Sequence, residues 1–351
     1  MKIHCRNTQT FFSNVFNAVG IGVVIALLPN AVLGEILKVY SHSSAFINSI
    51  YYLVMTIQSL MSLVIGVLAA YYFKFNGSGI AIVGISSMLG SGAIQVRNNQ
   101  IVLQGMGDIV NTILIVILSC LIFLLLHEKL GSLQMIILPV IIPITSGISG
   151  MYLLPYTSKL TSFLGHMVSY FTELNPLVMA VLISVTYALL MVTPISVVAI
   201  ATAIGLSGLG SGAANMGAVM ACVTFLIGSL KVNSIGINTV LFIGAAKVMI
   251  PVYFKNPIII IPLTINGIIG GITAYLIGIE GTPMSAGFGY TGLIGPINAF
   301  NRMSGDPTTN VSLLIISYLF IPVVTAFLVH KLSLRFLKTY NQDVFKFEMS
   351  N

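Results

Sequence analysis

The sequence predicts an all-α protein that crosses a membrane many times as one polytopic domain. The run from Ile109 to Leu126 is eighteen residues long and contains no charge. A helix of that length rises roughly 27 Å, close to the hydrocarbon thickness of a bilayer. Similar runs recur from Phe11 to Leu332, and 57% of the 351 residues are hydrophobic whereas 7% are charged. Soluble proteins carry about 25% charged residues, so a soluble domain of useful size has no place in this chain.

The apolar runs predict where the helices cross the membrane. In chain order the predicted spans are residues 11–29, 45–72, 78–93, 108–127, 132–155, 175–204, 210–230, 257–279 and 310–331. Two further apolar stretches, 234–253 and 282–300, are interrupted by Gly, Pro, Asn or Lys. Such interruptions are typical of re-entrant hairpins or broken helices. We therefore expect about ten transmembrane helices together with two re-entrant hairpins.

Basic residues flank both ends of the chain and predict its orientation. Lys2 and Arg6 precede the first span, and four basic residues follow the last one: Lys331, Arg335, Lys338 and Lys346. Short flanks rich in Lys and Arg stay on the cytoplasmic side. Both termini are therefore predicted to be cytoplasmic, which requires an even number of crossings, eight or ten. The formal charge of +7 is not interpreted as a nucleic-acid signal, because the basic residues are scattered singly.

Two windows are especially rich in glycine: 205–217 (GLSGLGSGAANMG) and 281–296 (GTPMSAGFGYTGLIGP). Glycine allows membrane helices to approach closely, and close packing is one interpretation of both windows. The other interpretation is unwound backbone that lines a cavity, with its amides and carbonyls satisfied by protein, water or a bound solute. Because both windows also contain polar groups, we expect the second interpretation, with the two segments acting as gates.

A few charged residues lie where water is scarce, at a cost of roughly 2.5 to 3.5 kcal/mol each at the bilayer centre. Asp108 and Glu35 are predicted to be helix-end charges that reach the interface. Lys247 and Glu280 belong to broken segments without an obvious route to water. We expect these two to form an internal pair or the two polar poles of a solute site, with interfacial snorkelling of Lys247 as the main alternative.

Amide and hydroxyl groups near these charges complete the predicted solute site, because each sugar hydroxyl must be matched when it leaves water. The predicted substrate-binding residues are Asn215, Lys247, Asn256, Glu280 and Thr282. No phosphate-binding glycine loop, HExxH motif or paired-cysteine ladder is found. The sequence therefore predicts no catalytic centre, metal site or cofactor on this chain, and leaves open whether it belongs to an enzyme system.

Four segments resemble the membrane (IIC) components of bacterial sugar phosphotransferase systems, in the branch named perfringolysin regulator-like (PfoR-like). They are residues 17–38 (NAVGIGVVIALLPNAVLGEILK), 105–113 (GMGDIVNTI), 205–217 and 255–300. In the last segment, Asn256-Pro257 with Ile261-Pro262 looks like the element that follows a sugar-binding hairpin in this family. The resemblance implies a homodimeric permease of the bacterial cytoplasmic membrane, in which a sugar lies between a scaffold and a moving transport domain. The scaffold would be residues 1–170, the transport half 171–330 and a cytoplasmic tail 331–351.

The chain departs from the family at one functional position. Typical sugar-transporting members carry a Glu-Pro pair shortly before the Asn-Pro step, and its carboxylate binds sugar hydroxyls. Here the corresponding stretch, 244–254 (GAAKVMIPVYF), contains no acid, and Lys247 lies nearby. Glu280, followed by Thr282-Pro283, is the candidate replacement. The phosphorylated IIA and IIB modules are not found in these residues, so the resemblance implies that they would be separate partner chains.

Three functions follow as hypotheses. The first is the permease component of a sugar phosphotransferase system. The second is a membrane sensor or regulator, derived from a transporter, that binds a solute or a partner without transport. The third is an ion-coupled secondary transporter with Glu280 or Asp108 as its proton or cation site.

Overall fold

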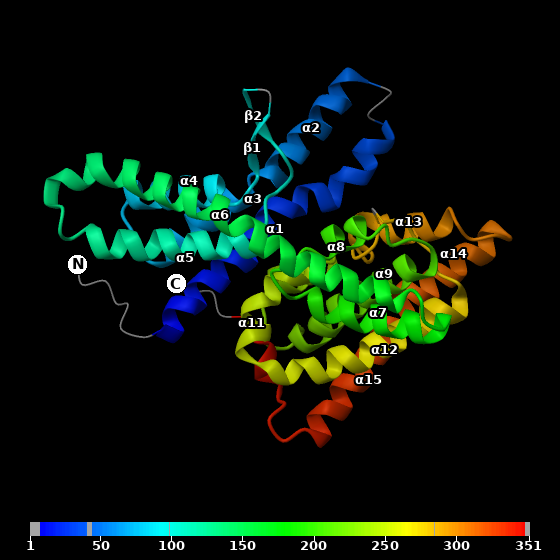
Figure 1. The fold of residues 1–351 in the computed structure, drawn as a ribbon. Helices are drawn as coiled ribbons and strands as arrows, with labels where there is room; N and C mark the ends of the chain where they lie inside the picture. Colours follow the sequence, from blue (N-terminus) through cyan, green and yellow to red (C-terminus); the bar gives the residue numbers. More distant parts are fainter. Residues whose placement is uncertain (1–7, 41–43, 98, 284, 348–351) are drawn as a thin grey trace. The chain divides into compact units, whose positions relative to one another are not determined.

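The computed structural model describes residues 8–40, 44–97, 99–283 and 285–347. Figure 1 shows a chain of helices with one short two-stranded ribbon. The chain divides into two compact units, one up to Leu160 and one that begins at Thr161. Helix α6 (Gln134–Phe171) runs through this boundary, and also through residue 170, where the change from scaffold to transport half was predicted.

The first unit consists of helices that follow the predicted spans. Its elements are α1 (Thr8–Tyr40), α2 (Ala45–Ser59), α3 (Met61–Tyr72), α4 (Gly77–Gly90), β1 (Ile94–Arg97), β2 (Gln100–Leu103), α5 (Ile109–Leu126), the 3-10 turn η1 (Gly131–Leu133) and the first part of α6. The antiparallel β1–β2 ribbon was not predicted. Asp108 caps α5 by accepting a hydrogen bond from Asn111 N at 2.7 Å, as expected of a helix-end acid. The described part of the chain does not include Lys2 and Arg6, on which the predicted orientation of the N-terminus depends. The side chain of Glu35 is also outside it.

A buried asparagine joins three helices of this unit. The side-chain amide of Asn111 donates to the carbonyl of Gly90 on α4 at 2.6 Å and to that of Gly150 on α6 at 3.0 Å. The backbones of Gly90 and Gly150 approach so closely that a Cβ on Gly150 would lie 2.3 Å from Gly90 O. This combination of small residues and one amide is typical of helix packing in lipid.

The second unit is built around α9. Its elements are the end of α6, α7 (Pro176–Leu190), α8 (Val197–Ala203), α9 (Gly208–Ser229), α10 (Ile235–Phe242), η2 (Ala246–Met249), α11 (Ile250–Lys255), η3 (Pro257–Ile259), α12 (Ile260–Ile277), η4 (Thr291–Leu293), α13 (Ile294–Phe300), α14 (Pro307–Ile315), the π-helical turn η5 (Ile316–Phe320), α15 (Ile321–Phe336) and η6 (Gln342–Phe345). Helices α7, α12 and α15 all pack against α9, as Figure 1 shows for the green, yellow and orange-red helices.

The prediction of unwound backbone in the 205–217 window was wrong, because residues from Gly208 onward form the regular helix α9. Glycine serves close packing here: a Cβ on Gly217 would lie 2.2 Å from Ser184 O of α7. In the same way, Gly271 of α12 faces the backbone of α7, with Val181 Cα 2.5 Å from its ideal Cβ position. The window 281–296, by contrast, is largely non-helical before α13, as predicted.

Fewer helices are long enough to cross a bilayer than the predicted ten. Six described helices meet that condition by length and apolarity, or seven if α2 and α3, bent by 47°, form one span. Helices α4 and α7 are apolar but have only 14 and 15 residues, which makes them about 21 and 22 Å long. The predicted span 175–204 is divided into α7 and α8, and the stretch 234–253 into α10, η2 and α11. Gly, Pro and polar residues therefore shorten several of the predicted spans.

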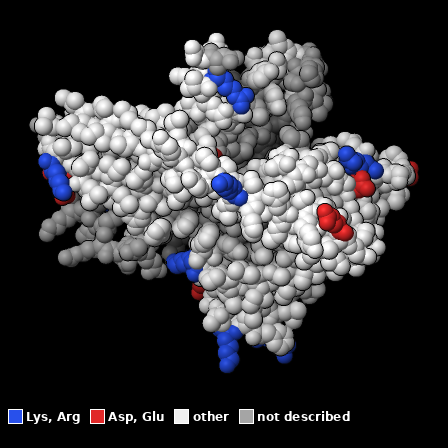
Figure 2. Space-filling model, in the orientation of Figure 1, with Lys and Arg blue, Asp and Glu red and all other residues white. Residues whose placement is uncertain are grey.

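The exposed surface of the long helices is apolar. Met135 on α6, Leu276 on α12 and Phe320 beside α15 are 76%, 74% and 63% exposed. On the face drawn in Figure 2, charged side chains occur singly or in small groups on an otherwise uncharged surface. Because water does not favour contiguous apolar surfaces of this kind and lipid does, the chain is a multi-pass membrane protein.

Candidate functional site

The described residues between α12 and η4, 278–283 and 285–290, form the longest irregular segment of the second unit, and we refer to them as the crossing loop. Helix α12 ends where Gly278 adopts the left-handed conformation, with φ 70°. The loop then pairs with the first residue of α9, because Gly208 and Gly281 exchange two backbone hydrogen bonds of 3.0 Å each. These bonds satisfy peptide groups that would otherwise be unpaired away from water.

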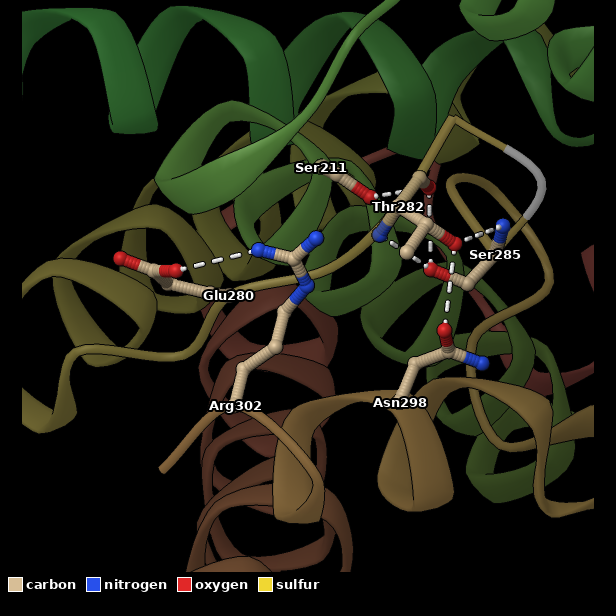
Figure 3. Close-up of polar contacts among 6 residues, drawn as sticks. All are labelled: Ser211, Glu280, Thr282, Ser285, Asn298 and Arg302. Carbon is tan, nitrogen blue, oxygen red and sulfur yellow. Dashed lines mark hydrogen bonds and ion pairs between the residues drawn. The ribbon is translucent and has the colours of Figure 1, made fainter. Parts of the chain in front are cut away.

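Thr282 fastens the crossing loop to its neighbours (Figure 3). Its carbonyl accepts a hydrogen bond of 2.8 Å from Ser211 Oγ of α9, and its hydroxyl donates to Asn298 Oδ1 of α13 at 3.1 Å. Its backbone N–H donates to Ser285 Oγ at 2.9 Å. Sequence reasoning identified Thr282 but missed Ser211, Ser285 and Asn298. Ser285 and Asn298 lie in the 255–300 segment on which the resemblance depends. The resemblance therefore indicated the region of these two residues, although not the residues themselves.

Glu280 lies at the start of the crossing loop and is paired with Arg302, so the internal pair with Lys247, one of the two predicted arrangements, is not formed. Its Oε2 lies 3.6 Å from Arg302 Nη1, and the two side chains are 46% and 39% exposed. Figure 3 shows the carboxylate and the guanidinium facing each other, apart from the Thr282 cluster. An ion pair of this length and exposure contributes about 0–1 kcal/mol. The carboxylate is therefore available to a further hydrogen-bonding partner.

Lys247 has a different environment from the predicted one. It lies on η2, is 9% exposed, and its Nζ donates to the carbonyls of Thr193 and Ile195 at 2.7 and 2.9 Å. Both carbonyls belong to the break between α7 and α8. The ammonium binds these carbonyls within the second unit, and the side chain is largely buried. The predicted pair with Glu280 is not formed, because the carbonyls of Thr193 and Ile195 bind the ammonium instead. A sequence pattern does not show which peptide carbonyls are free to do so.

Asn215 contacts the crossing loop from α9. Its side chain is fully buried, and its Oδ1 accepts a hydrogen bond of 3.1 Å from Gly289 N. Within the side-chain amide only the oxygen can accept from a peptide N–H, so this bond sets which amide atom faces Gly289. The Nδ2 group is left without a hydrogen-bond partner among the described residues. A buried donor of this kind costs about 1–3 kcal/mol unless something pairs with it.

Two buried tyrosines add further unpaired groups, one beside the same loop and one beside α13. The hydroxyls of Tyr187 and Tyr318 have no partner in the described part of the chain. A Cβ on Gly287 would lie 3.2 Å from the ring of Tyr187, and one on Gly295 would lie 3.2 Å from the ring of Tyr318. Neither tyrosine was predicted as a site residue, because an aromatic residue within an apolar run does not stand out in the sequence.

Asn256 supports the C-terminal segment. Its Nδ2 donates to Val344 O at 2.9 Å, and Val344 and Phe345 are buried. Of the five predicted site residues, the structure therefore brings Asn215, Glu280 and Thr282 to the crossing loop. Lys247 and Asn256 bind backbone carbonyls elsewhere in the unit. Among the residues described, no group of three His, Cys, Asp or Glu side chains could hold a metal ion.

Comparison with known proteins identifies the family to which this arrangement belongs. No curated protein sequence matches the chain. The family described as "Phosphotransferase system, EIIC" matches residues 13–347, which is almost the whole chain. The crossing loop, the broken helices and the apolar exterior described above are all within the matched range. The chain therefore belongs to the EIIC family, the membrane permease components of phosphotransferase systems.

Proposed function

We propose that this protein is a sugar permease component whose solute site is formed by the crossing loop and Asn215. Membership of the EIIC family supports a sugar substrate and phosphotransferase partners in general terms. The observation that carries the specific site is the unpaired Nδ2 of fully buried Asn215, held beside Gly289. It is a donor in a region where lipid and apolar side chains offer no acceptor, and a sugar hydroxyl can accept from it.

Glu280 supplies the acidic group that the 244–254 stretch does not. It lies on the same loop as Gly289, and its only ion pair among the described residues is the half-exposed one with Arg302. A carboxylate accepts hydrogen bonds from sugar hydroxyls, and each such charged bond is worth about 1.5–3 kcal/mol. The remaining features follow the resemblance: a PfoR-like homodimer with cytoplasmic termini and separate IIA and IIB chains, in which the half from residue 171 moves against a scaffold.

The solute can be identified by a thermal-shift screen of the purified protein against hexoses, pentoses, disaccharides and sugar acids. A ligand that binds only the folded state raises the melting temperature by mass action. We expect the neutral or acidic sugar that fits the site to give a concentration-dependent rise. The sugar with the largest rise is the probe for the variants described below.

Glu280→Gln should weaken binding of that sugar by roughly 10- to 100-fold, because a charged hydrogen bond is replaced by a neutral one. The melting temperature without sugar should change little, since the ion pair with Arg302 is exposed. Titration of each purified protein with the sugar, followed by thermal shift, measures both quantities. Glu173→Gln is the matched control, because Glu173 is exposed on the connection after α6. Equal affinity of Glu280→Gln and wild type would remove Glu280 from the site.

Proteoliposome uptake separates transport from the two alternatives. Sugar phosphate that appears only after IIA and IIB proteins are added supports the permease. Uptake driven by an imposed ion gradient supports a secondary transporter. Binding without any flux supports a sensor, an alternative favoured by the missing Glu-Pro pair.

A further inference from the structure

The break between α7 and α8 exposes carbonyl oxygens inside the second unit. Helix α7 ends at Leu190 and α8 begins at Val197. Between them, the carbonyls of Thr193 and Ile195 accept no backbone hydrogen bond within the described part of the chain. The ammonium of Lys247 donates a hydrogen bond to each of these two carbonyls. Both oxygens also lie just after the C-terminal, negative end of the α7 dipole.

Lys247 has no acidic counter-ion in the described part of the chain. Its ammonium lies 2.7 and 2.9 Å from the two oxygens, while the side chain is 9% exposed. A buried charge is costly unless it is paired or well hydrogen-bonded. Two carbonyl dipoles and a helix C-terminus therefore stabilise the buried ammonium, as a carboxylate would in an ion pair.

We propose that the α7–α8 break is a monovalent-cation site that the chain fills with its own Lys247 ammonium. Unwound carbonyls at a broken membrane helix are the ligands with which transporters coordinate Na⁺. In this protein the positive charge is tethered and does not exchange with solution. The broken helix is therefore held together without an external cation, and neither Na⁺ nor K⁺ is needed at this break.

Removing the amine should turn the break into an exchangeable site. The Lys247→Ala variant leaves the Thr193 and Ile195 carbonyls unpaired and opens space beside them. We expect its melting temperature to be lower than that of wild type in N-methylglucamine chloride. Sodium or potassium chloride at the same ionic strength should raise it by several degrees, in proportion to the logarithm of cation concentration. Wild type should melt at the same temperature in all three salts.

Two further variants control for general effects. Lys231→Ala removes a lysine that is exposed after α9, so it should show no difference among the salts. Lys247→Met removes the charge but fills the space, so it should lose stability equally in all three. Melting of Lys247→Ala at one temperature in all three salts would overturn the proposal.

Wild-type protein tests the proposal without any variant. Higher stability of wild type in Na⁺ or K⁺ than in N-methylglucamine would also overturn the proposal if Lys247→Ala abolishes that difference. Should Lys247→Ala fail to fold, wild type is compared with Lys247→Met: a cation-selective rise in the wild type that Lys247→Met lacks would count against the proposal, and equal melting of the wild type in all three salts would support it. None of these measurements involves sugar, so their outcome is independent of the proposed solute site.

Discussion

Gly212→Ala should strongly destabilise the protein and abolish sugar binding, although alanine is the better helix former. Gly212 lies in the first turns of α9, where a Cβ would come within 1.7 Å of Ile279 O and 3.1 Å of Glu280 N. These are backbone atoms of the crossing loop itself, so no side-chain rotation relieves the overlap. Helix propensity favours alanine by about 1 kcal/mol, which is too little to offset the displacement.

The displacement would break specific contacts. The loop must move away from α9, which removes the two 3.0 Å bonds between Gly208 and Gly281 and the bond from Ser211 to Thr282 O. Overpacking costs about 1–3 kcal/mol and each lost hydrogen bond about 1 kcal/mol, so we expect a loss of roughly 3 kcal/mol or more. The melting temperature in detergent and binding of the sugar probe would both be measured.

Gly236→Ala is the matched control for that experiment. Gly236 is also a helical glycine, on α10, but the nearest atom to its ideal Cβ position is Ser234 Oγ at 3.9 Å. Its stability should stay the same or rise by up to about 1 kcal/mol. A melting temperature of Gly212→Ala equal to that of Gly236→Ala would mean that the close approach of the loop to α9 is not required.

The contrast between the two glycine-rich windows shows what sequence composition can and cannot predict. Composition suggested that both would be unwound, yet only the second is largely irregular. In a water-poor interior an unpaired peptide group costs several kcal/mol, whereas each helical glycine costs about 1 kcal/mol relative to alanine. The helix is therefore favoured unless other groups satisfy the backbone. The crossing loop is tolerated because Gly208 and Ser211 of α9 bind its backbone and Ser285 supplies a further partner from within the loop. The contacts with α9 are long-range, so they cannot be read from a local pattern.

The positions of the long spans were easier to predict than the site. Bilayer thickness imposes a run of apolar residues, and that run is visible at 109–126 and 210–230. The partners of charged residues depend instead on tertiary contacts. Glu280 meets Arg302, and Lys247 meets peptide carbonyls at 193 and 195. Residue type correctly identified these side chains as unusual, but it could not determine which of them reach the crossing loop.

Asn215→Leu tests whether the buried amide is a solute ligand or a purely structural group. Leucine has the same branching and number of side-chain heavy atoms, although it is bulkier, and it removes both the bond to Gly289 N and the unpaired Nδ2 donor. Losing the first should lower stability by about 1–3 kcal/mol, because the Gly289 N–H is left unpaired. If Nδ2 donates to a sugar hydroxyl, affinity for the sugar probe should also fall roughly tenfold or more.

Asn266→Leu separates these two effects. Asn266 on α12 is also fully buried and donates to Thr224 Oγ1 of α9 at 2.8 Å, with its own Oδ1 unpaired. Thr224 is nine residues beyond Asn215 along α9, about 13.5 Å along the helix axis. Asn266→Leu should therefore lose comparable stability and keep wild-type affinity. If both variants lose affinity in proportion to their stability, the amide of Asn215 acts only through the fold. A selective loss in Asn215→Leu is the result that a sugar ligand at the crossing loop requires.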